Sequence, residues 1–161
     1  MRVAVITLSD SGYAGKRADL SGPAIQEMVE ERGWTVVQTT LLPDGREMLE
    51  RELRRLCDGG LADLILTTGG TGFSPTDVTP EATMAVVERP TPGIPEAMRY
   101  YSLQITPRAM LSRAAAGIRG RTLIVNLPGS PKAVRECLQA ILPALDHGLE
   151  ILKGTGGNCA R

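Results

Sequence analysis

The residues best suited to chemistry lie in one short stretch, where an apolar run stops at Gly69, Gly70, Thr71 and Gly72 and the acid Asp77 follows. Glycines at the end of a strand allow positive φ angles and a close approach of the backbone to a ligand. Backbone N–H groups exposed in such a turn, beside the N-terminus of a helix, favour an anion such as phosphate. A carboxylate does not suit phosphate directly, but it can hold the magnesium ion that does. This stretch therefore predicts a site for a phosphate ester.

The dipeptide Thr79-Pro80 in the same stretch is a helix-start signal. We expect the Thr79 hydroxyl to cap the helix and Pro80 to occupy its first position. A structural explanation of the stretch stays open, in which the turn only joins a strand to a helix and Asp77 favours the helix dipole. No Gly-Lys-Ser or Gly-Lys-Thr follows a glycine loop and no G-x-G-x-x-G opens a helix, so nucleotide chemistry here is neither P-loop nor standard dinucleotide binding.

The composition argues against several classes of protein. With 18 basic and 18 acidic residues the formal net charge is zero, so the chain lacks the basic excess of a nucleic-acid-binding protein. Aromatic residues make up 3 %, which is too few for a single-strand stacking platform. No apolar run approaches the roughly 18 residues of a membrane span, and the strand-like N-terminus does not resemble a signal peptide. We therefore expect a cytoplasmic protein that binds neither nucleic acid nor membranes.

The inventory of catalytic side chains is also narrow. His147 is the single histidine, which excludes a histidine-rich zinc site, and the 3 cysteines include no Cys-x-x-Cys pair. The side chains left for chemistry are carboxylates, lysines, arginines and hydroxyls, together with backbone N–H groups.

The segments that must position these residues alternate between strand-like and helix-like patterns. We expect strands at residues 2–9, 35–42, 62–68, 115–118 and 121–127. Helices are expected between them, at residues 21–33, 46–58, 80–87, 96–103, 106–112 and 130–152, the last bending or breaking at Pro143. Thr106-Pro107 is a further cap signal, for the helix at 106–112. This order implies parallel strands with helical crossovers, and hence an α/β sandwich. Residues 1–161 fit one domain, with 153–161 as a loose tail.

Polar or glycine-rich turns follow four of the expected strands, at residues 9–12, 42–45, 68–72 and 126–130. Ligands in open α/β sheets bind beyond the carboxyl ends of the strands, so we expect these turns to form one site. Asp44 and Asp77 would then both face a phosphate-binding floor, an arrangement suited to magnesium. Local explanations stay open: Asp44 as a turn residue, Asn126 as a satisfied strand-end residue, Ser130 as a helix cap and Lys132 as a solvated lysine.

Five blocks in order, at residues 67–72, 77–82, 92–99, 111–114 and 126–132, span most of the chain. Together they resemble the MogA/MoaB-type molybdenum cofactor biosynthesis proteins, a family that includes the G domain of gephyrin and Cnx-type proteins. The resemblance implies a three-layer α/β/α sandwich with a mostly parallel sheet, the molybdopterin-binding fold. It also implies a homotrimer, or a hexamer, that binds molybdopterin and MgATP and that hands its product to a molybdenum-insertion protein.

In this family the catalytic type transfers AMP from ATP to the terminal phosphate of molybdopterin, giving adenylyl-molybdopterin and pyrophosphate. Asp44 and Asp77 match the family's two functionally important acids, which we expect to bind or position magnesium as metal ligands and catalytic residues. Backbone N–H groups of residues 69–72 would face phosphate. The resemblance places the remaining ligand-binding residues at Ser9, Ser11, Glu96, Ser112, Asn126, Pro128, Gly129, Ser130 and Lys132.

One departure from the family pattern is Thr76, which stands where relatives often have Arg. If that Arg contacts phosphate in the relatives, this chain either lacks the contact or makes it through Lys16, Arg17 or Lys132. Two alternatives to adenylyl transfer stay open at this point. The first is a non-catalytic MoaB-like molybdopterin-binding or carrier protein, and the second is a nucleotide or phosphate-ester hydrolase. The choice between a molybdenum and a tungsten pathway also stays open.

Overall fold

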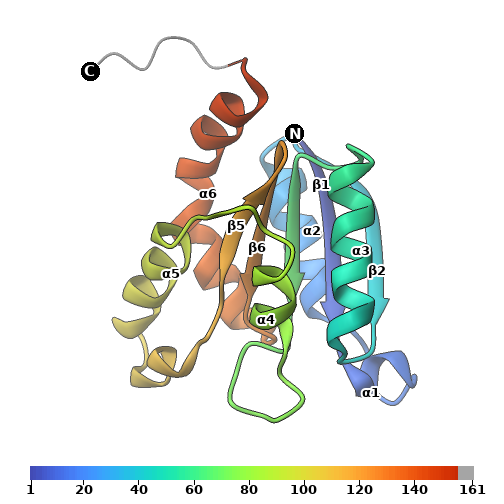
Figure 1. The fold of residues 1–161 in the computed structure, drawn as a ribbon. Helices are drawn as coiled ribbons and strands as arrows, with labels where there is room; N and C mark the ends of the chain where they lie inside the picture. Colours follow the sequence, from blue (N-terminus) through green and yellow to red (C-terminus); the bar gives the residue numbers. More distant parts are fainter. Residues whose placement is uncertain (156–161) are drawn as a thin grey trace.

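A six-stranded sheet in the order β2-β1-β3-β6-β5-β4 is the middle layer of the computed structural model, which describes residues 1–155 (Figure 1). Four neighbouring strands are parallel: β2 (Thr35–Leu42), β1 (Arg2–Leu8), β3 (Leu64–Thr68) and β6 (Thr122–Leu127). The strands β5 (Ala116–Arg119) and β4 (Arg89–Pro90) extend the sheet through antiparallel pairings. The expected mostly parallel sheet is confirmed.

Helices cover both faces of the sheet because successive strand residues point to opposite sides. On one face α2 (Ser21–Glu31), α5 (Gly93–Leu103) and α6 (Pro131–Lys153) pack with Val3, Val5, Leu64 and Leu66. On the other face α3 (Arg46–Asp58) and α4 (Thr79–Met84) pack with Ala4, Ile6 and Ile65. Both clusters are buried, which explains why the central strands read as continuous apolar runs.

Short elements surround the carboxyl ends of the strands. The single turn α1 (Asp10–Tyr13) follows β1, and the 3₁₀ helix η1 (Pro107–Leu111) follows α5. The Thr106 hydroxyl accepts from the N–H of Arg108 and caps η1, and the Ser130 hydroxyl accepts from the N–H of Ala133 and caps α6. Both caps agree with the sequence expectation. The expected helix at 96–103 begins three residues earlier, at Gly93.

The expected cap of α4 by Thr79 is wrong. The helix begins at Thr79 itself, and the cap position, Val78, makes no side-chain capping bond. The Thr79 hydroxyl instead donates to the carbonyl of Gly69 at 2.9 Å, while its backbone N–H donates to the carbonyl of Gly70 at 3.1 Å. The hydroxyl therefore satisfies the glycine turn rather than the helix, because the turn folds back over the start of α4.

The last helix was expected to bend or break at Pro143, and the break is wrong, since α6 runs from Pro131 to Lys153 without interruption; the bend stays a prediction. Proline removes one helical hydrogen bond, to the carbonyl four residues earlier, which is that of Gln139. Pro143 and Gln139 are both exposed, so water can satisfy that carbonyl. Leu142 and Leu145 hold the helix on the sheet from its buried side.

The last helix reaches the region expected to form a tail. Lys153 is still helical, and Gly154 ends the helix in the left-handed conformation at φ 74°. Residues 156–161 lie outside the described residues, so the loose tail stays a prediction. Within residues 1–155, no helix is both long enough and apolar enough to cross a membrane.

Candidate functional site

The carboxyl ends of the four parallel strands meet at one edge of the sheet, as the sequence predicted. The registers pair Leu8 with Leu42, Thr7 with Thr68, and Thr68 with Leu127. The chain crosses from β1 to β2 on one side of β1, and the next strand, β3, lies on the other side of β1. The gap between β1 and β3 is therefore the switch point where open α/β sheets bind ligands.

The turns after β1, β3 and β6 pack backbone against backbone. A Cβ on Gly69 would lie 2.3 Å from the carbonyl oxygen of Leu8, and Gly69 has φ 96°. A Cβ on Gly129 would lie 3.4 Å from the Cα of Gly69. The Thr68 hydroxyl also donates to the carbonyl of Pro128 at 2.7 Å. Gly69 is therefore required by the packing of these turns, besides any approach of a ligand.

Asp44 is held in place by Asp10, a residue that the sequence reasoning did not select. The N–H of Asp10 donates to Asp44 Oδ2 at 3.1 Å, and the N–H of Asp44 donates to Asp10 Oδ1 at 2.9 Å. This reciprocal pair joins α1 to the turn before α3. The signal was available, because Asp10 lies in one of the four turns expected to converge.

The surroundings of Asp44 disfavour the ionised form of its carboxyl group. Partial burial raises the pKa of Asp44, and the negative charges of Asp10 and Asp77 raise it further, against the lowering effect of the hydrogen bond from the Asp10 backbone. None of these three acids forms an ion pair with a side chain of residues 1–155. Within the described part of the chain, no ion pair neutralises their carboxylates.

Asp77 lies against the glycine turn from the other end of the loop. Its Oδ2 accepts from the N–H of Ser74 at 3.0 Å and would be 2.9 Å from a Cβ on Gly72. Asp44 Oδ1 would be 3.7 Å from a Cβ on Gly70. The two predicted acids are thus brought beside neighbouring residues of one turn.

The fit of this arrangement to magnesium follows from its donor set. No group of three or more His, Cys, Asp or Glu residues in the described part of the chain is arranged to hold a metal ion by itself. Magnesium, however, typically keeps several waters and binds one or two carboxylates together with substrate phosphates. Asp44 and Asp77 fit an ion that arrives with a phosphate ligand, but not a resident structural ion.

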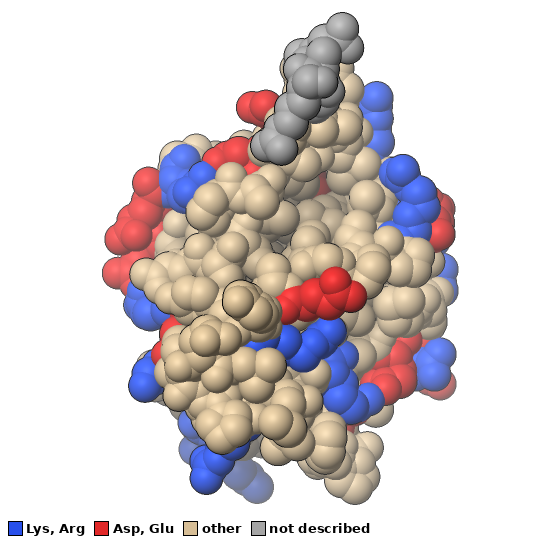
Figure 2. All heavy atoms as spheres, turned by 90° about the vertical axis from the view of Figure 1, so that its left-hand side faces the viewer, with Lys and Arg blue, Asp and Glu red and all other residues tan. Residues whose placement is uncertain are grey.

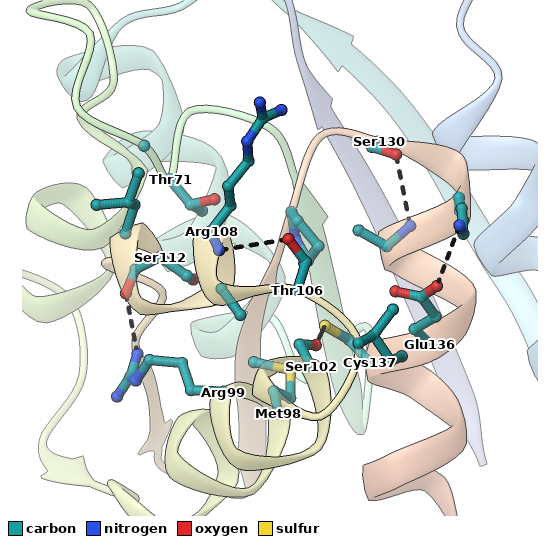
Figure 3. Close-up of a pocket in the computed structure, with 17 residues that line it drawn as sticks. Thr71, Met98, Arg99, Ser102, Thr106, Arg108, Ser112, Ser130, Glu136 and Cys137 are labelled. Atoms are coloured by element: carbon teal, nitrogen blue, oxygen red, sulfur yellow. Dashed lines mark hydrogen bonds and ion pairs between the residues drawn. The ribbon is translucent and has the colours of Figure 1, made fainter.

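A pocket of about 640 Å³ opens on the other flank of the glycine turn (Figure 3). Six of the predicted site residues line it: Thr71, Gly72, Ser112, Pro128, Ser130 and Lys132. Side chains from α5, η1 and the first turns of α6 complete the wall, among them Arg99, Thr106, Arg108 and Glu136. Thr106 was expected only as a helix cap, and nothing in its local sequence marks it as part of a pocket.

A smaller pocket of about 90 Å³ lies at the switch point itself. Ser9, Gly69 and Gly129 line it with Arg17 and Ser21. The Ser21 hydroxyl donates to the carbonyl of Gly129 at 2.7 Å, so the start of α2 is fixed to the turn after β6. Arg17 lines this pocket and Lys132 lines the larger one, so two of the cations considered as substitutes for the missing Arg lie beside the site.

Asn126 has no surface available for a ligand, since it is 0 % exposed. Its amide N–H₂ donates to the hydroxyls of Thr67 at 3.0 Å and Thr83 at 2.8 Å. Its Oδ1 accepts from the N–H of Ala115 at 3.2 Å. These contacts favour the structural explanation, in which Asn126 joins β3, α4 and the start of β5 beneath the site.

Two predicted residues are less closely tied to these pockets. Ser11 is exposed in α1, with its hydroxyl 3.3 Å from that of Ser9. Glu96 is exposed in the first turn of α5 and does not line the larger or the smaller pocket. Their expected roles in ligand binding stay predictions.

Known proteins resemble the chain over nearly its full length. The family described as "Probable molybdopterin binding domain" matches residues 4–147. The chain is 42 % identical to the molybdopterin adenylyltransferase of Helicobacter pylori strain J99, over 96 % of this chain and 89 % of that protein. It is 40 % identical to the molybdopterin adenylyltransferase of Escherichia coli K12, over 89 % of this chain and 75 % of that protein.

Solved structures agree in fold. The molybdopterin biosynthesis enzyme MoaB from Thermus thermophilus superposes with a TM-score of 0.91 at 47 % identity, covering 98 % of this chain and 99 % of that one. The tungsten cofactor synthesizing protein MoaB from Pyrococcus furiosus gives a TM-score of 0.85 at 32 % identity, covering 94 % and 96 % of the two chains.

Proposed function

The chain belongs to the molybdopterin-binding family of molybdenum cofactor biosynthesis proteins, and we propose that it is a molybdopterin adenylyltransferase. In the proposed reaction an oxygen of the terminal phosphate of molybdopterin attacks the α-phosphorus of ATP. The bond between the α-phosphorus and the bridging oxygen breaks, and pyrophosphate leaves. The curated relatives that carry this name support the assignment at 40–42 % identity over most of the chain.

The observation that carries the proposal is the pair of acids beside a glycine turn. Asp44 and Asp77 approach Gly70 and Gly72 from two different loops, and no cation of the described residues pairs with either acid. A site that keeps negative charge uncompensated next to a phosphate-binding turn is suited to a substrate that brings its own divalent cation.

Each group of residues has a defined role in this scheme. Asp44 and Asp77 would hold magnesium, which supplies charge neutralisation on the ATP oxygens when bound. Asp10 orients Asp44 through the two backbone-to-carboxylate bonds. The N–H of Gly69 is used by the carbonyl of Leu127 at 3.3 Å, so the backbone N–H groups of residues 70–72 and of the start of α6 would be the ones that face phosphate oxygens. The 640 Å³ pocket combines apolar side chains such as Met98 and Leu111 with hydroxyl and charged side chains, a lining that fits an organic ligand with polar groups such as the pterin.

No histidine base is needed for this reaction. A phosphate nucleophile is already ionised at neutral pH, and phosphoryl transfer relies mainly on positioning and electrostatic stabilisation. The single histidine, His147, lies in the last third of α6 and does not line either of the two pockets at the site. The side chains present are therefore sufficient for the proposed step.

The test is to mix the purified protein with molybdopterin and MgATP and to assay adenylyl-molybdopterin and pyrophosphate. Formation of both products in equal amounts, dependent on both substrates and on magnesium, is the expected result. Pterin binding without product would indicate a MoaB-like binding or carrier protein. ATP cleavage in the absence of pterin would indicate a hydrolase.

We also propose that the protein is cytoplasmic, assembles as a homotrimer or hexamer and passes its product to a molybdenum-insertion protein. Exposed apolar side chains on α5 and η1 support self-association, among them Tyr100 at 72 % and Met110 at 64 % exposure. Figure 2 shows the side of the molecule that includes α5, where uncharged residues form most of the surface. Light scattering after size-exclusion chromatography gives the oligomeric state directly.

A further inference from the structure

The loop that carries Asp77 has no packing of its own. It leaves β3 after the glycine turn, projects beyond the sheet and returns at the start of α4 (Figure 1). Its central residues, 73–76, are all exposed, and the side chain of Phe73 is 70 % exposed. Within the loop, two bonds join Ser74 and Asp77: the Ser74 N–H to Asp77 Oδ2 and the Asp77 N–H to the Ser74 carbonyl. The position of the loop therefore depends on what holds its two ends.

Both ends are held by one side chain, that of Arg113, which follows η1. The Nε of Arg113 donates to the carbonyl of Gly72 at 2.7 Å, and its Nη2 donates to the carbonyl of Asp77 at 2.5 Å. Its Nη1 pairs with the carboxylate of Glu81 in the first turn of α4. The backbone N–H of Arg113 donates to the carbonyl of Thr71 at 2.9 Å. The guanidinium of Arg113 thus bridges the two ends of the loop, from Gly72 to Asp77.

We infer that Arg113 is a positioning residue for Asp77: it holds the carbonyls of Gly72 and Asp77 at a fixed separation and thereby keeps the Asp77 carboxylate beside the glycine turn. The guanidinium suits this task because its donors form a rigid planar fork, which lysine lacks. The catalytic consequence rests on the proposed adenylyl transfer, whereas the structural consequence does not.

The contacts with carbonyls matter more here than the ion pair. The side chains of Arg113 and Glu81 are 33 % and 43 % exposed, and exposed ion pairs contribute little to stability. Both carbonyls could be hydrated in the absence of Arg113, so global folding does not require the clamp. Its distinctive effect is the restriction of residues 73–77, because the bonds from Thr79 to the carbonyls of Gly69 and Gly70 fix only the base of the loop.

The chain contains a matched control in Arg119, the last residue of β5. Arg119 donates to both carboxylate oxygens of Asp58, at 2.7 and 3.0 Å, and to the carbonyl of Val86 at 3.1 Å. It is also partly exposed, at 20 %. Arg119 therefore matches Arg113 in bonding both a carboxylate and a backbone carbonyl, but none of these bonds reaches the Asp77 loop.

The experiment compares Arg113→Met, Arg113→Lys and Arg119→Met with the unmodified protein. The first readout is millisecond hydrogen–deuterium exchange at the amides of Ser74 and Asp77 in the ligand-free protein. The second is the magnesium concentration that gives half-maximal adenylyl transfer. Thermal unfolding is recorded for every variant, so that loop effects are separated from loss of the fold.

In Arg113→Met we expect exchange at the two loop amides to rise at least about tenfold, because two charge-assisted hydrogen bonds to the loop are lost. The magnesium requirement should rise about 10- to 100-fold, the usual effect of losing a residue that orients a metal ligand. Arg113→Lys should recover part of both effects. Arg119→Met should leave loop exchange and the magnesium requirement unchanged.

Three results would overturn the inference. Unchanged loop exchange in Arg113→Met shows that the clamp does not restrict the loop. An equal rise in Arg119→Met shows general destabilisation instead. Faster loop exchange with an unchanged magnesium requirement shows that loop order does not position Asp77. If the unmodified protein makes no adenylyl-molybdopterin, the proposed function fails, while the exchange measurement still decides whether Arg113 holds the loop.

Discussion

Acidic side chains at the two ends of the sheet have opposite surroundings. At the amino end, Asp63 is 4 % exposed and receives bonds from the Arg2 backbone at 2.8 Å, the Arg2 guanidinium at 2.9 Å and Lys153 at 3.1 Å. Burial alone would raise the pKa of Asp63, but the bonds from Arg2 and Lys153 outweigh it and lower the pKa to about 2.

At the carboxyl end, the acids face one another. Burial raises the pKa of Asp44, and the charges of Asp10 and Asp77 raise it further, while the Asp10 backbone opposes this. The fold thus pairs cations with the carboxylate that it uses for stability, whereas no cation of residues 1–155 forms an ion pair with the carboxylates beside the glycine turn. We interpret the second arrangement as a binding site for a cation that comes with the substrate.

The strongest test of this contrast is Asp77→Asn. The amide keeps the shape of the side chain but removes the charge, so we expect adenylyl transfer to fall by about 10²-fold or more. Thermal stability should not fall, because no cation loses its partner. Asp63→Asn serves as the control, with normal turnover in the folded protein. Turnover by Asp77→Asn close to that of the unmodified protein would remove Asp77 from the metal site.

Asn126→Ala separates support of the site from contact with the ligand. Removal of the amide leaves the hydroxyls of Thr67 and Thr83 and the N–H of Ala115 without a partner in a buried place. We expect the free energy of unfolding to fall by about 2–3 kcal/mol, the usual cost of unsatisfied buried groups. Denaturant titration measures it. A loss of pterin affinity at unchanged stability would instead indicate a direct role in binding.

Asp63→Asn should lower the free energy of unfolding at pH 7 by about 2 kcal/mol. This figure follows from the difference between the pKa of Asp63 in the unfolded chain, 3.8, and its pKa in the fold, about 2. It is reduced slightly because Arg2 and Lys153 are partly exposed, so solvent screens their charges. Because the pKa is lowered by folding, this stabilisation is complete above pH 4 and disappears as the pH falls toward 2. Urea titrations of both proteins across this range should converge at the acidic end.

The pH dependence of Asp44 should have the opposite sign. Because folding raises its pKa, the charged form destabilises the fold, so Asp44→Asn should be slightly more stable than the unmodified protein at pH 7. This gain should vanish at pH values where Asp44 is protonated. The acidic limb of the kcat/KM profile should lie above the usual pKa of an aspartate, since that profile reports the free enzyme. Equal stability at all pH values would contradict the raised pKa.

Local sequence was sufficient for the four parallel strands and for the convergence of their turns, but not for the two-residue strand β4. Period, turn residues and the order of elements predict parallel strands, and parallel strands necessarily end at one edge. The expectation that Asp44 and Asp77 face one site follows from that geometry. The alternating assignment of Val3 and Ala4 to opposite cores likewise follows from the pleat.

Contacts between distant segments were not predictable in this way. The Thr79 hydroxyl has a choice of nearby acceptors, and only the folded turn places the Gly69 carbonyl within its reach. Asn126 resembled a ligand-binding residue because it stands at a strand end, although its partners come from β3, α4 and the start of β5. Arg113 lies 36 residues from Asp77 in sequence, so no local pattern connects them.

The most direct test of the central claim is the affinity of Mn²⁺ for the protein in the presence of a non-hydrolysable ATP analogue, read from the electron paramagnetic resonance of the bound ion. The unmodified protein and Asp63→Asn should bind the ion equally well. Asp44→Asn should bind it at least about tenfold more weakly, the usual effect of a lost metal interaction. Equal affinity in Asp44→Asn would contradict the assignment of the unpaired acids to a cation site.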